Sequence, residues 1–438
     1  MLAPALDREP LAGFTVLRFA HAFESGGGTE RYLDDLDRAL LERSATTVIR
    51  MHLTRDRRPK EQKEEGVGKG RLIRVPLPIV AEGDGEADEP DESFRSTLKK
   101  VVRDWIIYNP IVWRAGGARW TASLCMARKA GQAIGGGRAA AELFRTRQID
   151  LVVMHFFGGS DADEVIAEAR KRRVPVVLLN HYSNDRFLHL AIRKHAMLAD
   201  GVAGVNGLNM PGYLRDRFVN LSDGIDINFF QRANAQPLIN RPVQPIILMP
   251  ARVVREKGQM DLIRAVASMR KRGVWCCIAF AGRTDDGEFL EELRLEIARE
   301  GMTESVWFLG NVELEELRDW YGASAVVAYP TYHHEGLPRA VIEAQAMSLP
   351  VVAYSTGGIA EGIASGKSGY LLGTGDLRGL EKCLNELLLS ETARNAMGKR
   401  GREAVESRFS LSALAERHER FYNQAVSAFR NAPGKCSG

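Results

Sequence analysis

Short apolar runs alternate with amphipathic stretches of helical period along most of the chain. In the first half, such runs predict strands at 14–20, 46–53, 71–75, 150–155, 174–181 and 201–206, and the charged stretch before 71–75 is expected to be a loop. In the second half, strands are predicted at 245–250, 274–281, 306–310, 325–329, 350–355 and 369–372. Strands that alternate with helices in this way predict an α/β fold with two doubly wound parallel sheets.

A polar, proline-containing stretch at 231–245 separates the two halves and predicts the domain boundary. We expect an N-terminal domain over 1–228, with a basic insert at about 80–147, and a C-terminal domain over 229–409. The last helical stretch, 410–438, is long enough to cross back and complete the first domain. Because parallel sheets bind ligands at the carboxyl ends of their strands, the ligand edges of both sheets are expected to face one cleft.

The stretch from Glu335 to Glu343 joins a predicted buried strand to a helix. Pro338 suits the first helical position, where a missing N–H costs nothing. The first turn of a helix offers free N–H groups and the positive end of a dipole, which together can hold a phosphate. Two carboxylates beside such a site suit a sugar nucleotide, since carboxylates bind hydroxyls. A loop acid and an unrelated surface helix acid are the alternative for this pair alone.

Two cations, Arg252 and Lys257, lie in the predicted loop after 245–250. They can neutralise a diphosphate, and an arginine can do so through two parallel hydrogen bonds. Ordinary exposed loop charges are the alternative. His181 ends another predicted strand, at the edge where parallel sheets bind ligands, although a lone histidine there is more often structural.

A glycine-rich turn at 26–28 follows the first predicted strand and precedes a helical face. Glycine lets the backbone approach an anion closely. The turn lacks the G-x-G-x-x-G spacing, and no acidic residue ends the next strand, so a dinucleotide cofactor is disfavoured. A flexible surface turn is the alternative.

Composition narrows the class of protein. With 438 residues, 45% of them hydrophobic and 26% charged, the chain is typical of a globular protein with two or three cores. No apolar run is long enough to span a membrane, and residues 1–10 lack the apolar region of a signal peptide. The cysteines show no zinc-ligand or C-x-x-C spacing, which favours a reducing cytoplasm without a metal site. A net charge of +4 is too small to indicate nucleic-acid binding.

Positive charge is concentrated between residues 95 and 147. This segment carries eleven Lys or Arg residues against two acids, Asp104 and Glu142, with tryptophans interleaved. Such a segment can lie on an anionic membrane or hold a lipid-phosphate acceptor. A helical insert with a solvated basic face agrees equally well with the pattern.

Taken together, these motifs resemble retaining family-4 glycosyltransferases of the GT-B fold. In the second half, the matching motifs are Arg252-x-x-x-Glu256-Lys257-Gly258, Phe308-Leu309-Gly310 and Glu335-Gly-Leu-Pro-x-x-x-x-Glu343-Ala. In the first half, they are Gly26-Gly27-x-x-Glu30-Arg31 and Asp223-Gly-Ile-Asp226, the latter similar to the family's interdomain Asn-Gly-Val-Asp motif. The resemblance covers nearly the whole chain except residues 55–147. Pro338 in place of a frequent Gly, and Asp223 in place of Asn, depart from the family pattern.

The resemblance implies a role for each matched residue. Arg252 and Lys257 would bind the donor diphosphate, Glu335 the sugar hydroxyls and Glu343 the ribose hydroxyls. The implied catalytic set is Arg252, Lys257, Glu335 and His181. The implied donor-binding set comprises Gly27, Gly28, Gly282, Leu309, Gly336, Leu337 and Glu343.

The activity implied is transfer of a hexose-type sugar from a nucleotide-sugar donor to a hydroxyl, with retention at the anomeric carbon and without a metal or other cofactor. UDP is expected as the nucleotide of the donor because it is commoner than GDP among such donors, and no residue of the sequence indicates it. The expected acceptor is a glycan or lipid-linked glycan of cell-surface polysaccharide or glycolipid synthesis, met in the cytoplasm at the inner membrane face. A soluble small-molecule acceptor and a non-catalytic sugar-nucleotide-binding protein are the alternatives. A sugar-nucleotide epimerase or hydrolase would need first-domain carboxylates that are not evident.

Overall fold

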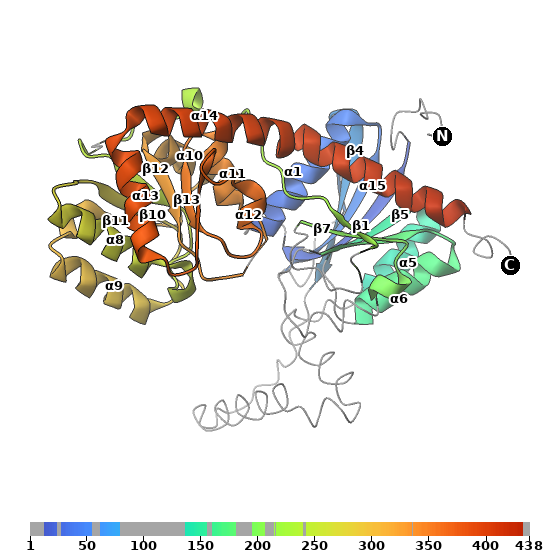
Figure 1. Cartoon of the computed structure of the whole chain (residues 1–438). Helices are drawn as coiled ribbons and strands as arrows, with labels where there is room; N and C mark the ends of the chain where they lie inside the picture. Colours follow the sequence, from blue (N-terminus) through green and yellow to red (C-terminus); the bar gives the residue numbers. More distant parts are fainter. Residues whose placement is uncertain are drawn as a thin grey trace, which may run out of the picture. The chain divides into compact units, whose positions relative to one another are not determined.

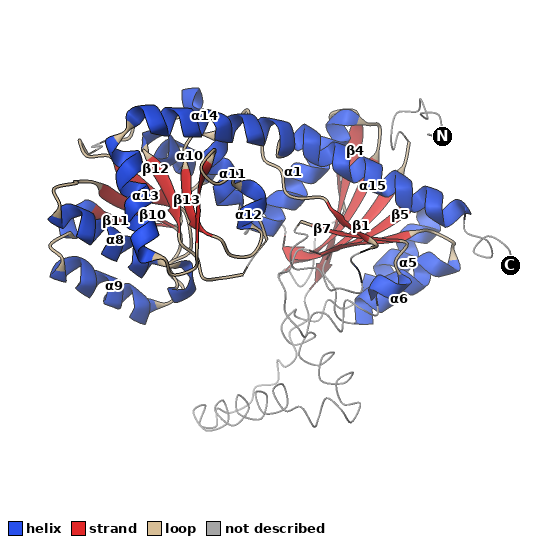
Figure 2. Cartoon of the chain, in the orientation of Figure 1, coloured by secondary structure: helices blue, strands red, loops and turns tan. Residues whose placement is uncertain are grey.

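The chain forms two compact units in the computed structural model (Figure 1). The structure describes residues 13–23, 28–54, 62–78, 136–155, 160–180, 195–205, 214, 216–239, 242–334 and 336–431. Unit 1 comprises Met1–Gly204, Pro211–Val219 and His418–Gly438, and unit 2 comprises Val205–Met210 and Asn220–Arg417. Each unit is built on a sheet with helices packed against it (Figure 2).

Unit 1 is organised around a sheet whose described strands follow the order β3-β4-β2-β1-β5-β6-β7-β8. The strands are β1 (Thr15–Phe23), β2 (Thr47–Thr54), β3 (Lys63–Val67), β4 (Gly70–Pro78), β5 (Leu151–His155), β6 (Val176–Asn180), β7 (Gly201–Gly204) and β8 (Phe218–Asn220). The described helices are α1 (Gly28–Arg43), α5 (Gly136–Thr146), α6 (Ser160–Lys171) and the part of α15 (Leu411–Asn431) that begins at His418. The pairs from β4 through β7 are parallel, whereas β3 is antiparallel to β4.

Strand β3 corrects the prediction of a loop before 71–75. Four of its five residues are exposed, so no alternation of apolar and polar residues marks it in the sequence. It pairs with β4 at the edge of the described sheet. Charged residues on such a strand discourage the edge from pairing with another chain.

Unit 2 holds a parallel sheet with the strand order β11-β10-β9-β12-β13-β14. The strands are β9 (Ile246–Met249), β10 (Cys277–Ala281), β11 (Val306–Gly310), β12 (Val326–Tyr329), β13 (Val351–Tyr354) and β14 (Gly369–Leu372). The helices are α8 (Gln259–Lys271), α9 (Gly287–Arg299), α10 (Leu314–Ala323), α11 (Arg339–Ala346), α12 (Ile359–Gly362), α13 (Leu377–Leu389) and α14 (Glu391–Arg408). Every residue of β9, β10, β12 and β13 is buried, which explains why these strands read as continuous apolar runs.

The sheet of unit 2 is wound in two directions from its centre. The chain runs from β9 outward through β10 to β11, returns to β12 beside β9, and then runs outward through β13 to β14. Right-handed crossovers therefore place α8 and α9 on one face and α10 and α11 on the other. Helix α8 accordingly packs against α9 and α13, while α11 packs against α14. The predicted fold class, two doubly wound parallel-sheet domains, is confirmed.

The structure divides the chain between 219 and 220 and between 417 and 418, whereas the sequence placed these boundaries at 228/229 and 409/410. Ile225 and Phe230 explain the first difference, because both side chains are buried in the hydrophobic core of unit 2. The polar stretch at 231–245 therefore lies within unit 2. His418 explains the second difference. It is the first residue of α15 that belongs to unit 1, and its Nε2 lies 2.7 Å from the Tyr32 hydroxyl of α1.

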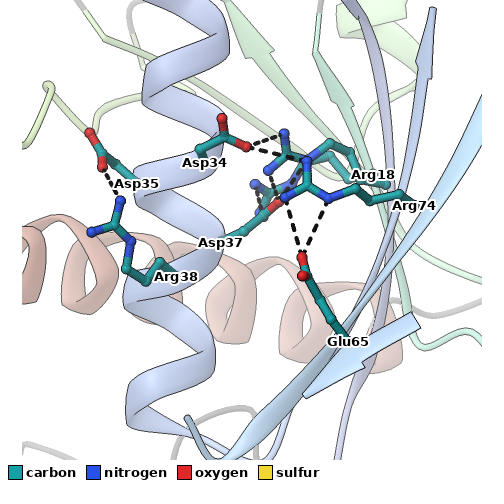
Figure 3. A network of polar contacts seen from close by, with 8 residues as sticks. Arg18, Asp34, Asp35, Asp37, Arg38, Glu65 and Arg74 are labelled. Carbon is teal, nitrogen blue, oxygen red and sulfur yellow. Dashed lines mark hydrogen bonds and ion pairs between the residues drawn. The ribbon is translucent and has the colours of Figure 1, made fainter. Parts of the chain in front are cut away.

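Unit 1 contains a buried ion-pair network across three neighbouring strands (Figure 3). Arg18 on β1 is in register with Arg50 on β2, which is in register with Arg74 on β4. Carboxylates of α1 neutralise this row, because Asp37 pairs with Arg18 and Arg50, and Asp34 pairs with Arg50 and Arg74. The network joins α1 to the sheet, and its central members Arg18, Arg50 and Asp37 are buried, whereas Asp34 and Arg74 are partly exposed.

Candidate functional site

The candidate site of unit 2 lies at the switch point of its sheet. Strands β9 and β12 are neighbours, and the chain leaves them in opposite directions. In open parallel sheets, ligands bind at such a point, beyond the carboxyl ends of the strands. The loops that follow β9 and β12 carry Arg252, Lys257 and the stretch that leads into α11.

Arg252 is half-exposed in the loop after β9. Its guanidinium donates a hydrogen bond of 2.6 Å to Asp285, in the loop after β10. This hydrogen bond, together with the charges of Arg283 and Arg252, lowers the pKa of the Asp285 carboxyl. The Asp285 carboxylate is therefore charged. It pairs with the Arg252 guanidinium, the group to which the resemblance assigns the donor diphosphate.

Lys257 has only 5% of its surface exposed. It ends the short 3-10 helix η3 (Arg255–Lys257), and its Nζ lies 5.6 Å from the centre of the Tyr329 ring. Because Tyr329 is the last residue of β12, the ammonium group lies at the carboxyl end of that strand. The sequence placed Lys257 in an exposed loop as one alternative, and the burial rules this alternative out.

The two loops are joined by backbone contacts. Tyr332 N donates to the Glu256 carbonyl at 2.8 Å, and the Thr331 hydroxyl donates to the same carbonyl at 3.1 Å. Gly258 adopts φ +85°, and a Cβ at this position would lie 2.0 Å from the Pro330 carbonyl oxygen. Only glycine meets both requirements, so Gly258 permits the close approach of the loops after β9 and β12.

Glu343 lies inside α11 with 1% of its surface exposed. The Tyr321 hydroxyl of α10 donates to its Oε2 at 3.1 Å, and Arg339 Nε is 3.9 Å from its Oε1. The sequence left open whether Glu343 is a solvated surface acid, and the structure shows that it is a buried carboxylate held by neighbouring polar groups.

Pro338 is not the first residue of α11, as the sequence predicted, but its N-cap. Its ψ of 131° is extended, and its carbonyl accepts a hydrogen bond of 3.0 Å from Val341 N. The N-cap residue has extended backbone, so the helix begins one position later, at Arg339. A missing N–H still costs nothing at the N-cap, because no intrahelical bond uses it.

The remaining predicted residues of unit 2 are mostly packing positions. A Cβ at Gly282 would lie 2.2 Å from the Ala251 carbonyl oxygen, so glycine brings the ends of β9 and β10 together. Leu309 on β11 is partly buried against the hydrophobic core. Leu337 is buried, and Gly336 is half-buried beside it.

Three predicted residues, Gly27, His181 and Glu335, lie outside the described residues. Gly28 is the first residue of α1. The basic segment at 95–147 is described only from residue 136 on, where it contributes α5.

Sequence reasoning missed a cluster around Asp261. The hydroxyls of Tyr332 and Tyr354 both donate to Asp261 Oδ2, at 2.6 Å and 2.7 Å. Burial, followed by the hydrogen bond to Asp261, raises the pKa of Tyr332 to about 12. The cluster fixes the start of the loop that leads from β12 to α11. Its three members lie on α8, on that loop and on β13, so no local motif reveals it.

The described part of the chain contains no group of three His, Cys, Asp or Glu side chains placed to hold a metal ion. Among the same residues, no helix is long and apolar enough to cross a membrane. Cys276, Cys277 and Cys383 are buried free thiols. The groups that the described site presents are the cations Arg252 and Lys257, the carboxylate of Glu343 and the start of α11.

Residues 231–404 match the family model for glycosyl transferases group 1, and this match lies within unit 2. The GDP-mannose-dependent alpha-(1-6)-phosphatidylinositol monomannoside mannosyltransferase of Mycolicibacterium smegmatis is 25% identical over 396 residues, which cover 86% of this chain and 89% of that relative. A D-inositol 3-phosphate glycosyltransferase of Corynebacterium jeikeium is 34% identical over 185 residues, which cover 41% of this chain and 43% of that relative.

Solved structures match both units. A glycosyltransferase from Rickettsia africae has a TM-score of 0.67 at 16% identity, and the match covers 96% of this chain and 99% of that chain. An Anabaena HepE protein in complex with UDP and glucose has a TM-score of 0.62 at 16% identity, covering 94% and 100%. At such identity these structures show the fold alone. This chain therefore has the GT-B fold, and its residues 231–404 match the model for glycosyl transferases group 1.

Proposed function

We propose that the protein transfers a hexose, with retention at the anomeric carbon, from a nucleotide sugar bound to unit 2 to a hydroxyl of an inositol phosphate. The observation that carries the donor half of this proposal is the pair of cations at the switch point. Arg252 and Lys257 arise from one loop after β9, and Lys257 is buried beside the end of β12. A diphosphate is the ligand that two such cations and the N-terminus of α11 suit.

In the proposed reaction, the bond between the anomeric carbon and the diphosphate oxygen breaks, and the acceptor oxygen bonds to the same face of that carbon. The acceptor proton passes to the leaving phosphate. Arg252 and Lys257 stabilise the negative charge that develops on the leaving group, without a metal ion. Glu335 positions the sugar, and Glu343 holds the ribose. For Arg252 to act, its guanidinium must exchange Asp285 for a phosphate oxygen.

The proposed donor is GDP-mannose. The relative that matches 86% of this chain carries GDP-mannose in its name, and this favours GDP over the UDP expected from frequency alone. HepE was solved with UDP and glucose, so a UDP-sugar is the second candidate.

The proposed acceptor follows from chemistry that two relatives share. One acts on a phosphatidylinositol mannoside and another on D-inositol 3-phosphate, so both names include an inositol ring bearing a phosphate. The eleven Lys and Arg residues of 95–147 supply positive charge suited to a phosphorylated or membrane-bound acceptor. The lipid-linked form is the first candidate, because its relative spans more of the chain.

The test is a matrix of donors and acceptors. GDP-mannose and UDP-glucose are each incubated with phosphatidylinositol vesicles, with D-inositol 3-phosphate or with buffer, and release of nucleoside diphosphate is measured. We expect acceptor-dependent release from GDP-mannose, and NMR of the product should show the anomeric configuration of the donor. Release that needs no acceptor would indicate a hydrolase. No release from either donor with either acceptor would overturn the proposal.

A further inference from the structure

A buried arginine, Arg339, connects the segment that enters unit 2 with the acid assigned to the ribose. Arg339 is the first residue of α11, and 8% of its side chain is exposed. Its Nη1 donates to Asp223 Oδ1 and to the Gly224 carbonyl, both at 3.1 Å. Its Nε lies 3.9 Å from Glu343 Oε1, one turn along the same helix. One guanidinium therefore lies between two buried carboxylates.

The segment that holds Arg339 is itself firmly anchored. Ile225 N donates to the Phe409 carbonyl at 2.8 Å, where the chain passes towards α15. Arg417 donates to the Leu221 carbonyl at 2.5 Å and to the Asp223 carbonyl at 3.0 Å. Asp223 therefore holds its carboxylate in a fixed position, and a fixed carboxylate can in turn fix the Arg339 guanidinium.

One member of the pair lies at a departure from the family pattern. Asp223 stands where the resembling family has Asn. A buried guanidinium needs a counter-charge, and an aspartate provides one while an asparagine does not. Asp223 therefore gives Arg339 a second counter-charge beside Glu343.

The orientation of the Glu343 side chain depends on its polar neighbours Tyr321 and Arg339. Its carboxylate is buried, and Tyr321 binds one oxygen while Arg339 approaches the other. A buried carboxylate remains charged and ordered only if polar groups replace its lost water. Removing the guanidinium would leave Glu343 and Asp223 as two acids without the cation between them.

We propose that Arg339, held by Asp223, is a positioning residue that orients Glu343 and thereby sets the affinity for the donor nucleotide. This inference rests on the proposed function, because it concerns the acid assigned to the ribose. Arg339 acts through Glu343 and leaves Arg252 and Lys257 in place. Its loss should therefore raise the donor KM much more than it lowers kcat.

The experiment measures GDP and UDP binding by calorimetry for the full chain and its variants. Arg339→Met is expected to weaken GDP binding by on the order of tenfold, the size of one lost coupling between contacting residues. With GDP-mannose as donor, KM should rise by a similar factor while kcat changes less than about twofold. Arg294→Met is the matched control, since Arg294 pairs with the exposed Glu291 at 2.7 Å on α9. The control should bind GDP like the wild type.

Asp223→Asn is the second variant, because it preserves shape and alters only charge. It is expected to weaken GDP binding by about threefold, and adding it to Arg339→Met should cause no further loss. A folded Arg339→Met variant with wild-type GDP affinity would overturn the positioning role. If Arg339→Met does not fold, unchanged affinity in Asp223→Asn would overturn it instead. A wild type that binds neither GDP nor UDP would overturn the proposed function, and this inference with it.

Discussion

At the residue scale, the site of unit 2 combines buried groups with exposed ones. Lys257 and Glu343 are almost fully buried, whereas Arg252 is half-exposed and paired with Asp285. Neighbouring side chains fix the positions of Lys257 and Glu343, so substituting either residue tests the contacts that the structure shows for it. Under the proposed function, Arg252 would exchange Asp285 for a phosphate oxygen when the donor binds.

Glu343→Gln tests the ribose role directly. The amide keeps the volume of the carboxylate but loses one strong acceptor and the charge facing Arg339. We expect GDP affinity to fall by about tenfold, with little change in the affinity for inorganic pyrophosphate, which has no ribose. Calorimetry with the two ligands checks this. Unchanged GDP affinity would contradict the assignment.

The Asp261 cluster predicts a dependence of stability on alkaline pH. The pKa of Tyr332 is raised to about 12, so the folded protein favours the neutral phenol. The stability that this hydroxyl contributes is fully present below a pH of about 10, the unfolded pKa, and is lost as pH rises towards about 12. Asp261→Asn should lower the Tyr332 pKa, because the hydrogen bond to a carboxylate and its charge both raise it. Absorbance of the phenolate against pH measures this, and an identical titration in both proteins would refute it.

At the element scale, strands β9, β10, β12 and β13 of unit 2 could be predicted from the sequence because every residue in them is buried. Strand β3 could not, since four of its five residues are exposed and the strand pairs only with β4, at the edge of the described sheet. The start of α11 was predicted one residue early, because proline is acceptable both at the N-cap and at the first helical position.

Contacts between elements were the least predictable feature. The Arg339–Asp223 pair joins residues 116 positions apart, and the Tyr354–Asp261 hydrogen bond joins residues 93 apart. No spacing rule links such positions. Arg252, Lys257 and Glu343 could be picked out beforehand because each lies in a short motif, but their burial and partners depend on the tertiary structure.

Gly258→Ala tests the junction between the loops after β9 and β12. An alanine there would combine an unfavourable φ of +85° with a Cβ placed 2.0 Å from a backbone oxygen. We expect a loss of about 2–3 kcal/mol in unfolding free energy by urea denaturation. Gly273→Ala is the control, because its φ of +83° is nearly the same and nothing lies within 4 Å of the added Cβ. Equal losses in both variants would show that the junction contributes nothing.

At the scale of the whole molecule, each unit has a stabilising device of its own. Unit 2 relies on one continuous hydrophobic core around its sheet. Unit 1 adds the buried network of Arg18, Arg50 and Asp37, which joins α1 to strands β1 and β2 (Figure 3). A substitution in this network should therefore destabilise unit 1 specifically.

Asp37→Asn is the substitution that tests this. It removes the carboxylate charge paired with buried Arg18 and one of the two paired with buried Arg50, so we expect a loss of about 3–5 kcal/mol in the unfolding of unit 1. Glu65→Gln is the control, since Glu65 is half-exposed and pairs with Arg74 at 3.3 Å, a surface interaction worth less than about 1 kcal/mol. Hydrogen exchange followed by mass spectrometry separates the two units. Equal deprotection of β1 and of β9 would contradict the assignment to unit 1.

The central claim is that Arg252 and Lys257 stabilise the leaving diphosphate. The most direct test is the kcat for GDP-mannose with the preferred acceptor, measured for Arg252→Ala, Lys257→Ala and the control Lys271→Ala, which removes an exposed lysine paired with Glu300. We predict that each site variant loses about 2–4 kcal/mol of transition-state stabilisation while the control keeps wild-type turnover. Wild-type turnover in both site variants would contradict the claim.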